Sequence, residues 1–270
     1  MSSTPPVVLS VAASDPTGGA GLQADLLTLA ALGCHPASVV TALTAQDTRG
    51  VEGVLAIDAD WVERQARVLL ADLPVAACKL GVLGSAANAR AIGKLLAGRS
   101  LPLVLDPVLA SARGDALTEA DAMRAMWESL LPLTTVLTPN SVEVRRLAGA
   151  APDASLEQCA RGLIDAGCKY VLVTGTHEAT PQVVNFLYDA RGLIREDSWQ
   201  RLPGGYHGSG CTLASAIAAF IARGRSVVDA ALEAQDYTWH ALAAGFRAGR
   251  GQLLPQRFHD EAARSLPDHA

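Results

Sequence analysis

Short apolar runs alternate with helical patterns along most of the chain, and this alternation constrains the fold more than any other feature. Apolar runs that are typical of buried strands occupy residues 7–13, 38–45, 76–80, 101–105, 135–137 and 170–174. Helical spacing occupies residues 20–32, 60–73, 86–96, 118–130, 141–147 and 156–166, with Gly33 as a candidate C-terminal cap. The alternation predicts an α/β fold with a mostly parallel central sheet and helices on both faces.

The last third of the chain changes pattern. Residues 182–188 and 193–199 flank Asp189-Ala190-Arg191-Gly192, which predicts a β-hairpin. Two helical patterns follow, over residues 209–223 and 227–247. Half of the 270 residues are apolar, and no linker rich in proline, serine or charge separates two patterned halves. We therefore expect residues 1–270 to form a single domain with a substantial core.

Charge and cysteine content exclude several classes of protein. The net charge of −5 and the lack of a basic run give no reason to expect nucleic-acid binding. We expect no membrane helix, because no charge-free apolar run approaches the roughly 18 to 20 residues that a span requires. The N-terminal residues also lack a signal-peptide pattern. Five scattered cysteines favour a reducing cytoplasm over a disulfide framework: Cys34, Cys78, Cys159, Cys168 and Cys211.

A glycine-rich stretch at residues 204–212 leads directly into the helical pattern that begins near residue 209. The free N–H groups and the positive dipole end of such a helix make an anion site. Cys211 stands at the first turn, where the same field lowers a thiol pKa and favours the thiolate. This arrangement suggests phosphoryl transfer. The alternative is a glycine-rich loop before a core helix, with the cysteine packed as a small hydrophobic side chain.

Polar residues recur where the predicted parallel strands end, which is where ligands gather in such sheets. They include Ser14-Asp15, Gln46-Asp47, Asp106, residues 138–140 and Thr174-Gly175. The loop at residues 15–21 matches neither the dinucleotide fingerprint nor the Walker pattern, so a tight turn also explains it. Asp25 lies one turn inside the next helix, where its carboxylate either faces solvent or turns back toward a ligand.

Five motif blocks carry a resemblance to a known family. They are AASDPTGGAGLQAD at residues 12–25, TALTAQDTRGV at 41–51, VLDPV at 104–108, LTPNSVE at 137–143 and HGSGCT at 207–212. Together and in this order they resemble the hydroxymethylpyrimidine and phosphomethylpyrimidine kinases, which are ribokinase-like enzymes of thiamine biosynthesis. The resemblance implies a three-layer fold and a homodimer. It also implies ATP- and Mg²⁺-dependent phosphorylation of 4-amino-5-hydroxymethyl-2-methylpyrimidine and of its monophosphate.

The resemblance also implies a substrate pocket. By match, Gln46 pairs with the edge of the pyrimidine ring, because its amide offers both a donor and an acceptor. Asp25 binds the hydroxymethyl or amino side of the substrate. Ala13, Val82 and Val108 line the ring.

On the phosphate side, the resemblance implies that Asp106 and Glu143 surround magnesium, which prefers oxygen ligands. Asn140, Thr174 and Thr176 lie on the nucleotide side. Asn140 and Glu143 also have the spacing of a helix capping box, and both roles can hold together.

In the wider ribokinase-like superfamily, an aspartate that takes the proton of the substrate hydroxyl usually stands at the position of Cys211. The pyrimidine kinases that this chain resembles carry a cysteine there, so we expect Cys211 to act as the base. The N–H groups of Gly208, Ser209, Gly210 and Cys211 would then hold the charge of the transferred phosphoryl group. Phosphoryl transfer depends mostly on positioning and electrostatic stabilisation, so we expect this loop to matter more than the base.

The sequence departs from the family pattern at three places. Ala13 replaces a frequent glycine, Thr174 replaces a lysine, and Gly205-Tyr206 replaces polar residues. Two alternatives to the pyrimidine kinase therefore stay open. One is a pyridoxal or pyridoxine kinase of the same superfamily, and the other is a non-catalytic pyrimidine-binding protein with a degraded ATP site.

Overall fold

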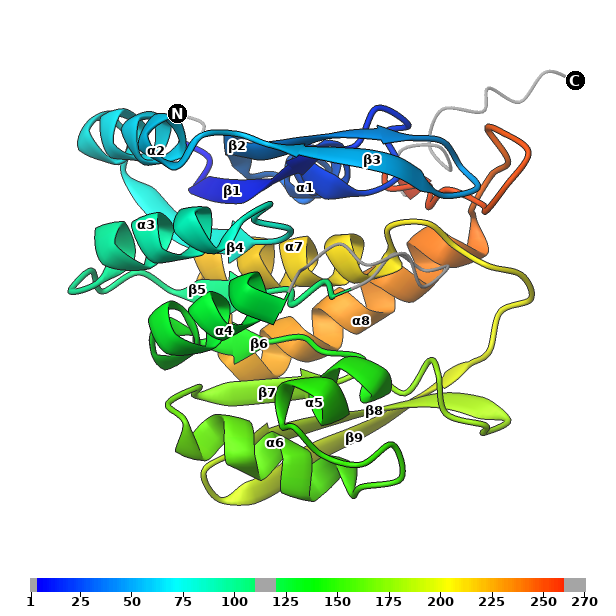
Figure 1. Ribbon diagram of the computed structural model, residues 1–270. Helices are drawn as coiled ribbons and strands as arrows, with labels where there is room; N and C mark the ends of the chain where they lie inside the picture. The colour runs from blue at the N-terminus through cyan, green and yellow to red at the C-terminus, as the bar shows by residue number, and fades with distance from the viewer. Residues whose placement is uncertain (1–3, 110–119, 260–270) are drawn as a thin grey trace, which may run out of the picture.

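The computed structural model describes residues 4–109 and 120–259, and in them nine strands form one sheet (Figure 1). The strands are β1 Val7–Ser14, β2 His35–Gln46, β3 Val51–Ala56, β4 Val75–Leu80, β5 Leu103–Leu105, β6 Val136–Leu137, β7 Tyr170–Val173, β8 Gln182–Asp189 and β9 Gly192–Gln200. Their order across the sheet is β3-β2-β1-β4-β5-β6-β7-β8-β9.

The middle of the sheet is parallel and its edges are antiparallel. Strands β2, β1, β4, β5, β6 and β7 run in one direction. Strand β3 at one edge, and β8 next to β9 at the other, pair in the antiparallel sense. The predicted mostly parallel sheet is confirmed. The carboxyl ends of all six parallel strands therefore lie along the same side of the sheet, and the polar residues that follow these strands meet there.

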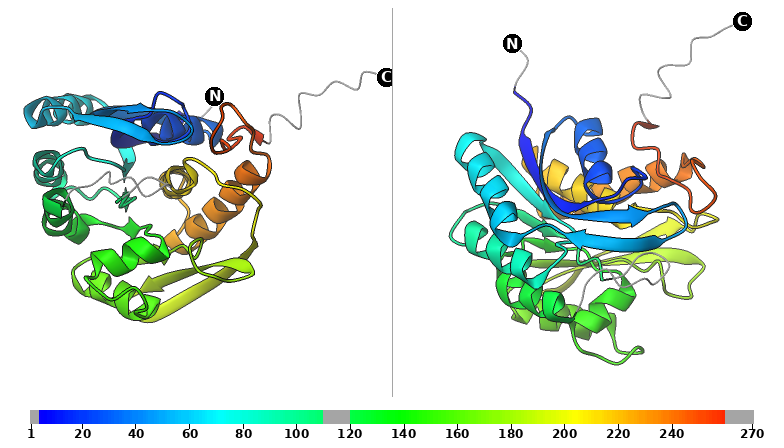
Figure 2. Two further views of the ribbon diagram at one scale, coloured as in Figure 1. Left: turned by 45° about the vertical axis from the view of Figure 1, so that its right-hand side comes forward. Right: turned by 45° about the horizontal axis from the view of Figure 1, so that its top comes forward.

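Helices cover both faces of the sheet. They are α1 Gly21–Ala31, α2 Ala59–Asp72, α3 Ala86–Leu96, α4 Ala120–Ser129, α5 Ser141–Leu147, α6 Leu156–Asp165, α7 Ser209–Ala222 and α8 Val227–Ala243, with a 3₁₀ turn at Leu131–Leu133. Helices α2 to α6 pack on one face, while α1, α7 and α8 pack on the other, as the left view of Figure 2 shows.

Alternate residues of the central strands enter the two cores. Leu9 and Leu105 face the α2 to α6 side, whereas Val8 and Val104 face α7 and α8. A strand covered on both faces must be apolar at nearly every position, which explains the continuous apolar runs in the sequence. None of the described helices is long and apolar enough to cross a membrane.

Most predicted elements are present, with shifted ends. Strand β3 was not predicted, because Gly53 and Glu52 weaken its pattern and it pairs only with β2 at the sheet edge. The last helix ends at Ala243 rather than at residue 247. Gly33 has a φ of 73°, as expected for a residue that ends α1. Residues 118 and 119 of one predicted helix lie outside the described residues.

A buried ion pair lies under the carboxyl end of the sheet. The Lys79 Nζ atom lies 2.8 and 2.9 Å from the two carboxylate oxygens of Asp25, and both side chains are fully buried. The hydroxyls of Ser10 and Ser215 donate to the same carboxylate over 2.6 and 2.8 Å. Burial lowers the pKa of Lys79, but nearby negative groups, Asp25 first, outweigh it and hold the pKa above its ordinary value.

The position of Asp25 contradicts the expected contact with substrate. All of its described partners are buried protein groups, so the carboxylate neither faces solvent nor turns toward the loop that precedes α1. The reason is electrostatic, because a buried lysine needs a counter-charge and Asp25 provides it.

The ion pair predicts a large loss of stability when only one partner is removed. We expect Asp25→Ala and Lys79→Met each to lower the free energy of unfolding by about 3–5 kcal/mol, since each leaves a buried charge unpaired. The double variant Asp25→Leu/Lys79→Met should lose less than the sum of the two. Urea unfolding measures all three. Glu233→Ala, which removes the exposed partner of Arg225, should lose less than about 1 kcal/mol, and equal losses at both pairs would contradict the account.

Candidate active site

Two adjoining cavities open at the carboxyl edge of the sheet. The first has a volume of about 200 Å³ and is lined from the ends of β1, β2, β4, β5 and β6 and from the start of α7. The second, of about 830 Å³, lies between the β7–β9 side of the sheet and helix α8. Thr176, His177, Tyr206 and Ser209 line both cavities, so the two spaces meet above the start of α7.

Helix α7 begins at this junction. Gly208 is its N-terminal capping residue, with a φ of 83°, and residues 208–211 all line the first cavity. A side chain at Gly208 would come within 1.8 Å of the Gly19 carbonyl oxygen, so only glycine fits there. No side chain caps the first turn, which leaves its amide groups at the cavity wall. The predicted helix start therefore lies at a cavity that an anion can enter.

Cys211 and Asp106 face each other at the base of the first cavity. Burial raises the pKa of the Cys211 thiol to about 12; the charge of Lys79 opposes the rise, and Asp106 and Asp25 add to it. The expected shift toward thiolate is therefore wrong for this structure, because burial beside two carboxylates outweighs the helix field. The thiol hydrogen-bonds to Asp106, whose own pKa burial raises to about 6.

Asp106 and Glu143 bring two carboxylates to one side of the cavity. Burial and the charge of Asp106 raise the pKa of Glu143 to about 7. The Asp106 Oδ2 atom is buried and has no hydrogen-bond partner among the described residues. A cation would satisfy this oxygen, although the described residues contain no cluster of three or more acidic, histidine or cysteine side chains that could hold a metal alone.

The capping-box interpretation of Asn140 and Glu143 is confirmed. The Asn140 Oδ1 atom accepts from the backbone N–H groups of Val142 and Glu143, and the Glu143 carboxylate accepts from the N–H of Asn140 over 2.9 Å. Both residues also line the first cavity. The cap therefore fixes the carboxylate of Glu143 near Asp106 and leaves open a second role for it.

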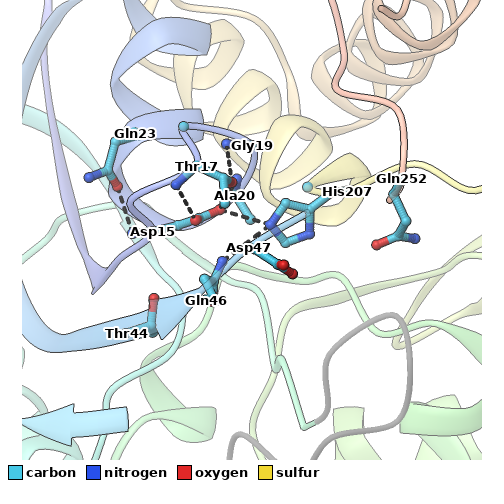
Figure 3. A network of polar contacts seen from close by, with 12 residues as sticks. Asp15, Thr17, Gly19, Ala20, Gln23, Thr44, Gln46, Asp47, His207 and Gln252 are labelled. Atoms are coloured by element: carbon cyan, nitrogen blue, oxygen red, sulfur yellow. Dashed lines mark hydrogen bonds and ion pairs between the residues drawn. The ribbon is translucent and has the colours of Figure 1, made fainter. Parts of the chain in front are cut away.

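Asp15, His207 and Gln46 also line the first cavity and form a polar network (Figure 3). The Asp15 carboxylate accepts from the N–H groups of Thr17 and Ala20 over 2.8 and 2.7 Å, which closes the loop before α1. The His207 Nε2 atom lies 2.8 Å from Asp15 Oδ2. Burial raises the pKa of Asp15, but hydrogen bonds from His207 and Thr17 outweigh it and hold the pKa below its usual value.

Nearly all of the sequence-predicted site residues converge on the two cavities. Those at the first cavity are Ala13, Gln46, Val82, Asp106, Val108, Asn140, Glu143, Thr176, Gly208, Ser209, Gly210 and Cys211. Thr174 and Thr176 line the second. Asp25 is the exception, because it lies beneath the cavity, where it pairs with Lys79.

Sequence reasoning assigned no role to Asp15, Lys79 or His207, which all line the first cavity. A lysine inside an apolar strand was a signal for Lys79, because a buried cation requires a partner. Asp15 precedes Pro-Thr-Gly-Gly, a turn pattern in which an aspartate bonds the following backbone. His207 gave no such signal, since its contacts come from residues 192 and 161 positions away in the chain.

The second cavity has apolar and aromatic walls. Its lining includes Val183, Trp199, Leu213, Trp239 and Leu242. Arg201 also lines it, and its guanidinium donates to the carbonyl oxygens of Thr176, Glu178 and Thr180. These bonds hold the loop after β7 in place.

Comparisons with known proteins identify the family. A family model described as phosphomethylpyrimidine kinase matches residues 15–256. The chain is 43% identical over 254 residues to a hydroxymethylpyrimidine/phosphomethylpyrimidine kinase of Streptomyces coelicolor, covering 92% of this chain and 93% of that one. It is 39% identical over 258 residues to the kinase of the same name from Rhizobium meliloti, covering 94% and 97%. The chain belongs to the phosphomethylpyrimidine kinase family.

Solved structures agree with this family membership. A pyridoxal kinase from Staphylococcus aureus in complex with ADP matches with a TM-score of 0.86 and 26% identity, over 96% of this chain and 95% of that one. A phosphomethylpyrimidine kinase from Clostridium difficile matches with a TM-score of 0.77 and 30% identity, over 88% and 99%. The predicted family, the ribokinase-like α/β fold and the phosphotransferase class are confirmed.

Substitution by alanine should lower the free energy of unfolding by different amounts at Gly208 and Gly224, although the two glycines have similar backbone conformations. Gly224 has a φ of 87° and open space where a side chain would stand, so Gly224→Ala should cost only the left-handed strain of about 1–2 kcal/mol. Gly208→Ala should cost distinctly more, because the methyl group would also displace the loop that carries Gly19. Urea unfolding compares the two variants, and equal losses would show that the loop can move aside without cost.

Proposed function

We propose that this member of the family phosphorylates 4-amino-5-hydroxymethyl-2-methylpyrimidine and its monophosphate, with ATP as the donor. One observation carries the proposal: the amide of Gln46 and the helix start at residues 208–211 face the same cavity. An amide suits the edge of an aminopyrimidine, and the helix start suits a phosphoryl group. A hydroxymethyl group on a ring bound at Gln46 would therefore point toward the anion site.

The second cavity supports ATP as the donor. Its volume of about 830 Å³ and its tryptophan and aliphatic walls suit a nucleoside, and it meets the first cavity beside Ser209. Related pyridoxal kinases from Staphylococcus aureus have been solved with ADP and with AMP-PCP. A nucleotide bound there would extend its terminal phosphate toward the amides of α7.

The chain's own residues would perform the transfer mostly by positioning. The amides of residues 208–211 hold the phosphoryl oxygens, and the positive end of α7 stabilises the charge that develops there. As the substrate hydroxyl attacks, Cys211 takes its proton at sulfur while the thiol proton moves to Asp106. The hydrogen bond from the thiol to Asp106 favours this exchange, and it leaves the Oδ2 atom of Asp106 free.

Asp106 and Glu143 would hold Mg²⁺. The unpartnered Asp106 Oδ2 atom and the adjacent carboxylate of Glu143 fit this ion, which binds one or two carboxylates together with phosphate oxygens. When bound, Mg²⁺ supplies positive charge that neutralises the phosphate oxygens.

We also propose that the protein is cytoplasmic and pairs as a homodimer. The five cysteines are all free, which fits a reducing compartment. Leu43 of β2 and Leu55 of β3 face each other across the strands at the sheet edge and are 47% and 65% exposed. An exposed apolar pair on an edge hairpin suits contact with a second copy. Sedimentation equilibrium distinguishes the dimer from a monomer.

A coupled assay of ADP release tests the function. We expect ADP release that depends on the pyrimidine alcohol, with pyridoxal as a weaker competitor, because identity to the pyrimidine kinases exceeds identity to the pyridoxal kinases. No turnover with either pyrimidine, in protein shown to be folded, would falsify the proposal. Calorimetric titration with an ATP analogue tests the non-catalytic alternative, which requires that the analogue does not bind.

Cys211→Ala should lower turnover by roughly 10²-fold, the scale of general acid–base catalysis, with little change in the unfolding midpoint. Cys159→Ala is the matched control, because Cys159 is also free but belongs to α6 and packs in the core away from the cavity. Near-normal turnover of Cys211→Ala would mean that another group or water takes the proton.

Stability should depend on pH and on Mg²⁺ together. The pKa values of Asp106 and Glu143 are raised in the folded protein, to about 6 and about 7, so these groups stabilise the fold when protonated. Their contribution to the free energy of unfolding is fully present when the pH is below their ordinary pKa values of 3.8 and 4.5. It is lost as the pH rises through their pKa values in the folded protein.

Mg²⁺ should therefore raise the melting temperature more at about pH 7.5 than at about pH 5, because protons compete for the same oxygens. Scanning calorimetry with and without magnesium chloride measures the difference. Asp106→Asn should remove most of the difference between the Mg²⁺-induced rises in melting temperature at the two pH values. If Mg²⁺ raised the melting temperature equally at both pH values, Asp106 and Glu143 would be excluded as its ligands.

A further inference from the structure

One histidine nitrogen contacts two polar side chains at the substrate end of the first cavity. The His207 Nε2 atom lies 2.8 Å from Asp15 Oδ2 and 3.3 Å from the amide nitrogen of Gln46. Figure 3 shows His207 between Asp15 and Gln46, with its ring edge directed at both. A single ring nitrogen cannot donate a hydrogen to Asp15 and accept one from Gln46 at the same time.

Asp15 decides which role the nitrogen plays. Its carboxylate accepts from two backbone N–H groups, from the Thr17 hydroxyl and from His207, and its pKa lies below the usual range. An ionised carboxylate only accepts, so the Nε2 atom of His207 must carry a hydrogen, whether the ring is neutral or protonated. A hydrogen-bearing Nε2 has no lone pair to accept from the Gln46 NH₂ group, so two donors would face each other if that group pointed at it. The amide oxygen can instead share the hydrogen that Nε2 directs at Asp15.

We propose that the Asp15–His207 pair fixes the orientation of the Gln46 amide, with its oxygen toward His207 and its NH₂ group away from it. His207 is then a positioning residue that determines substrate specificity. This inference rests on the proposed pyrimidine substrate. The amide oxygen has a second lone pair, so it can accept from the exocyclic amine of a 4-aminopyrimidine while the NH₂ group donates to the adjacent ring nitrogen.

The ring of His207 is held firmly enough to act in this way. A side chain at Gly19 would come within 2.5 Å of the His207 Cδ2 atom, so the ring lies directly against this glycine. The backbone N–H of His207 donates to the carbonyl of Leu253 over 2.9 Å, and helix α7 begins two residues later. Gly19 and Asp15 therefore restrict the ring while the backbone bond holds its Cα atom, and the N–H direction is set before any ligand binds.

A fixed amide distinguishes two closely related rings. A 4-oxopyrimidine presents an N–H donor and a carbonyl acceptor, the reverse of the 4-amino pattern. It would place donor against donor and acceptor against acceptor unless the Gln46 amide turned by half a rotation. With His207 in place, that rotation would break the hydrogen bond from Nε2 to the amide oxygen of Gln46. It would also turn the NH₂ group of Gln46 toward the N–H of His207.

The test compares binding of 4-amino- and 4-oxo-5-hydroxymethyl-2-methylpyrimidine by calorimetry in three proteins. In the wild type, the amino compound should bind more tightly. His207→Leu keeps the bulk of the side chain but loses the hydrogen-bond donor. In this variant the dissociation constant of the oxo compound, divided by that of the amino compound, should fall by about tenfold or more. This is the scale expected when one hydrogen bond is lost and one mismatch is relieved. His177→Leu removes another imidazole from the same cavity and should keep the wild-type ratio.

An unchanged ratio in His207→Leu would overturn the inference. A second measurement needs no variant to fold in order to be decisive, because nitrogen-15 NMR of the wild-type imidazoles reports which ring nitrogen carries the hydrogen. We expect the Nε2–H form for His207, whose signal is assigned by the contact of its ring with Gly19. A neutral Nδ1–H ring would also overturn the inference.

The outcomes separate this inference from the proposed function. An amino preference that depends on His207, without release of ADP, would refute the kinase activity and support the positioning role. Release of ADP with a ratio that His207→Leu leaves unchanged would support the kinase and refute the positioning role.

Discussion

The buried carboxylate of Asp25 connects the parts of the fold that form the site. It accepts hydrogen bonds from Ser10 of β1, Lys79 of β4 and Ser215 of α7, and it belongs to α1 itself. Ser215 lies one helical turn beyond Cys211, so this pair fixes the depth of the α7 start relative to the sheet. An unpaired charge in the core costs several kcal/mol of folding free energy. The contacts of Asp25 must therefore form together when this part of the protein folds.

The same pair determines the electrostatics of the first cavity. Lys79 is the cation that opposes the pKa rise of both Cys211 and Asp106, but its charge is already shared with Asp25. Burial raises the pKa of Asp106 to about 6, because Lys79 opposes the rise only in part. Burial and the charge of Asp106 raise the pKa of Glu143 to about 7. Asp106 lies next to the first turn of α7, where a side chain at Gly210 would come within 3.7 Å of its carboxylate. Negative charge beside helix amides suits a cation and a phosphate that enter together.

The sequence predicted the elements because a doubly covered sheet imposes apolar runs and because glycine and polar residues mark their ends. Residues near strand ends, such as Gln46 and Asp106, were placed well, since the parallel sheet brings all of these ends to one edge. Asp25 was misplaced because spacing on a helix gives its face but not its partner across the core. The thiol pKa of Cys211 was predicted in the wrong direction, because a helix start alone says nothing about burial or nearby carboxylates.

The loop at residues 15–20 connects the proposed pyrimidine pocket to the start of α7. Its aspartate orients His207, which the inference above connects to Gln46, and its Gly19 carbonyl occupies the space that a side chain at Gly208 would need. Arg257, which is buried, donates to the carbonyl of Gly19 over 2.6 Å and to the hydroxyl of Thr212 in α7. The loop, the start of α7 and the C-terminal segment are thus held as one unit. A change that moves the start of α7 should therefore also move His207, so the backbone couples the two ends of the proposed site.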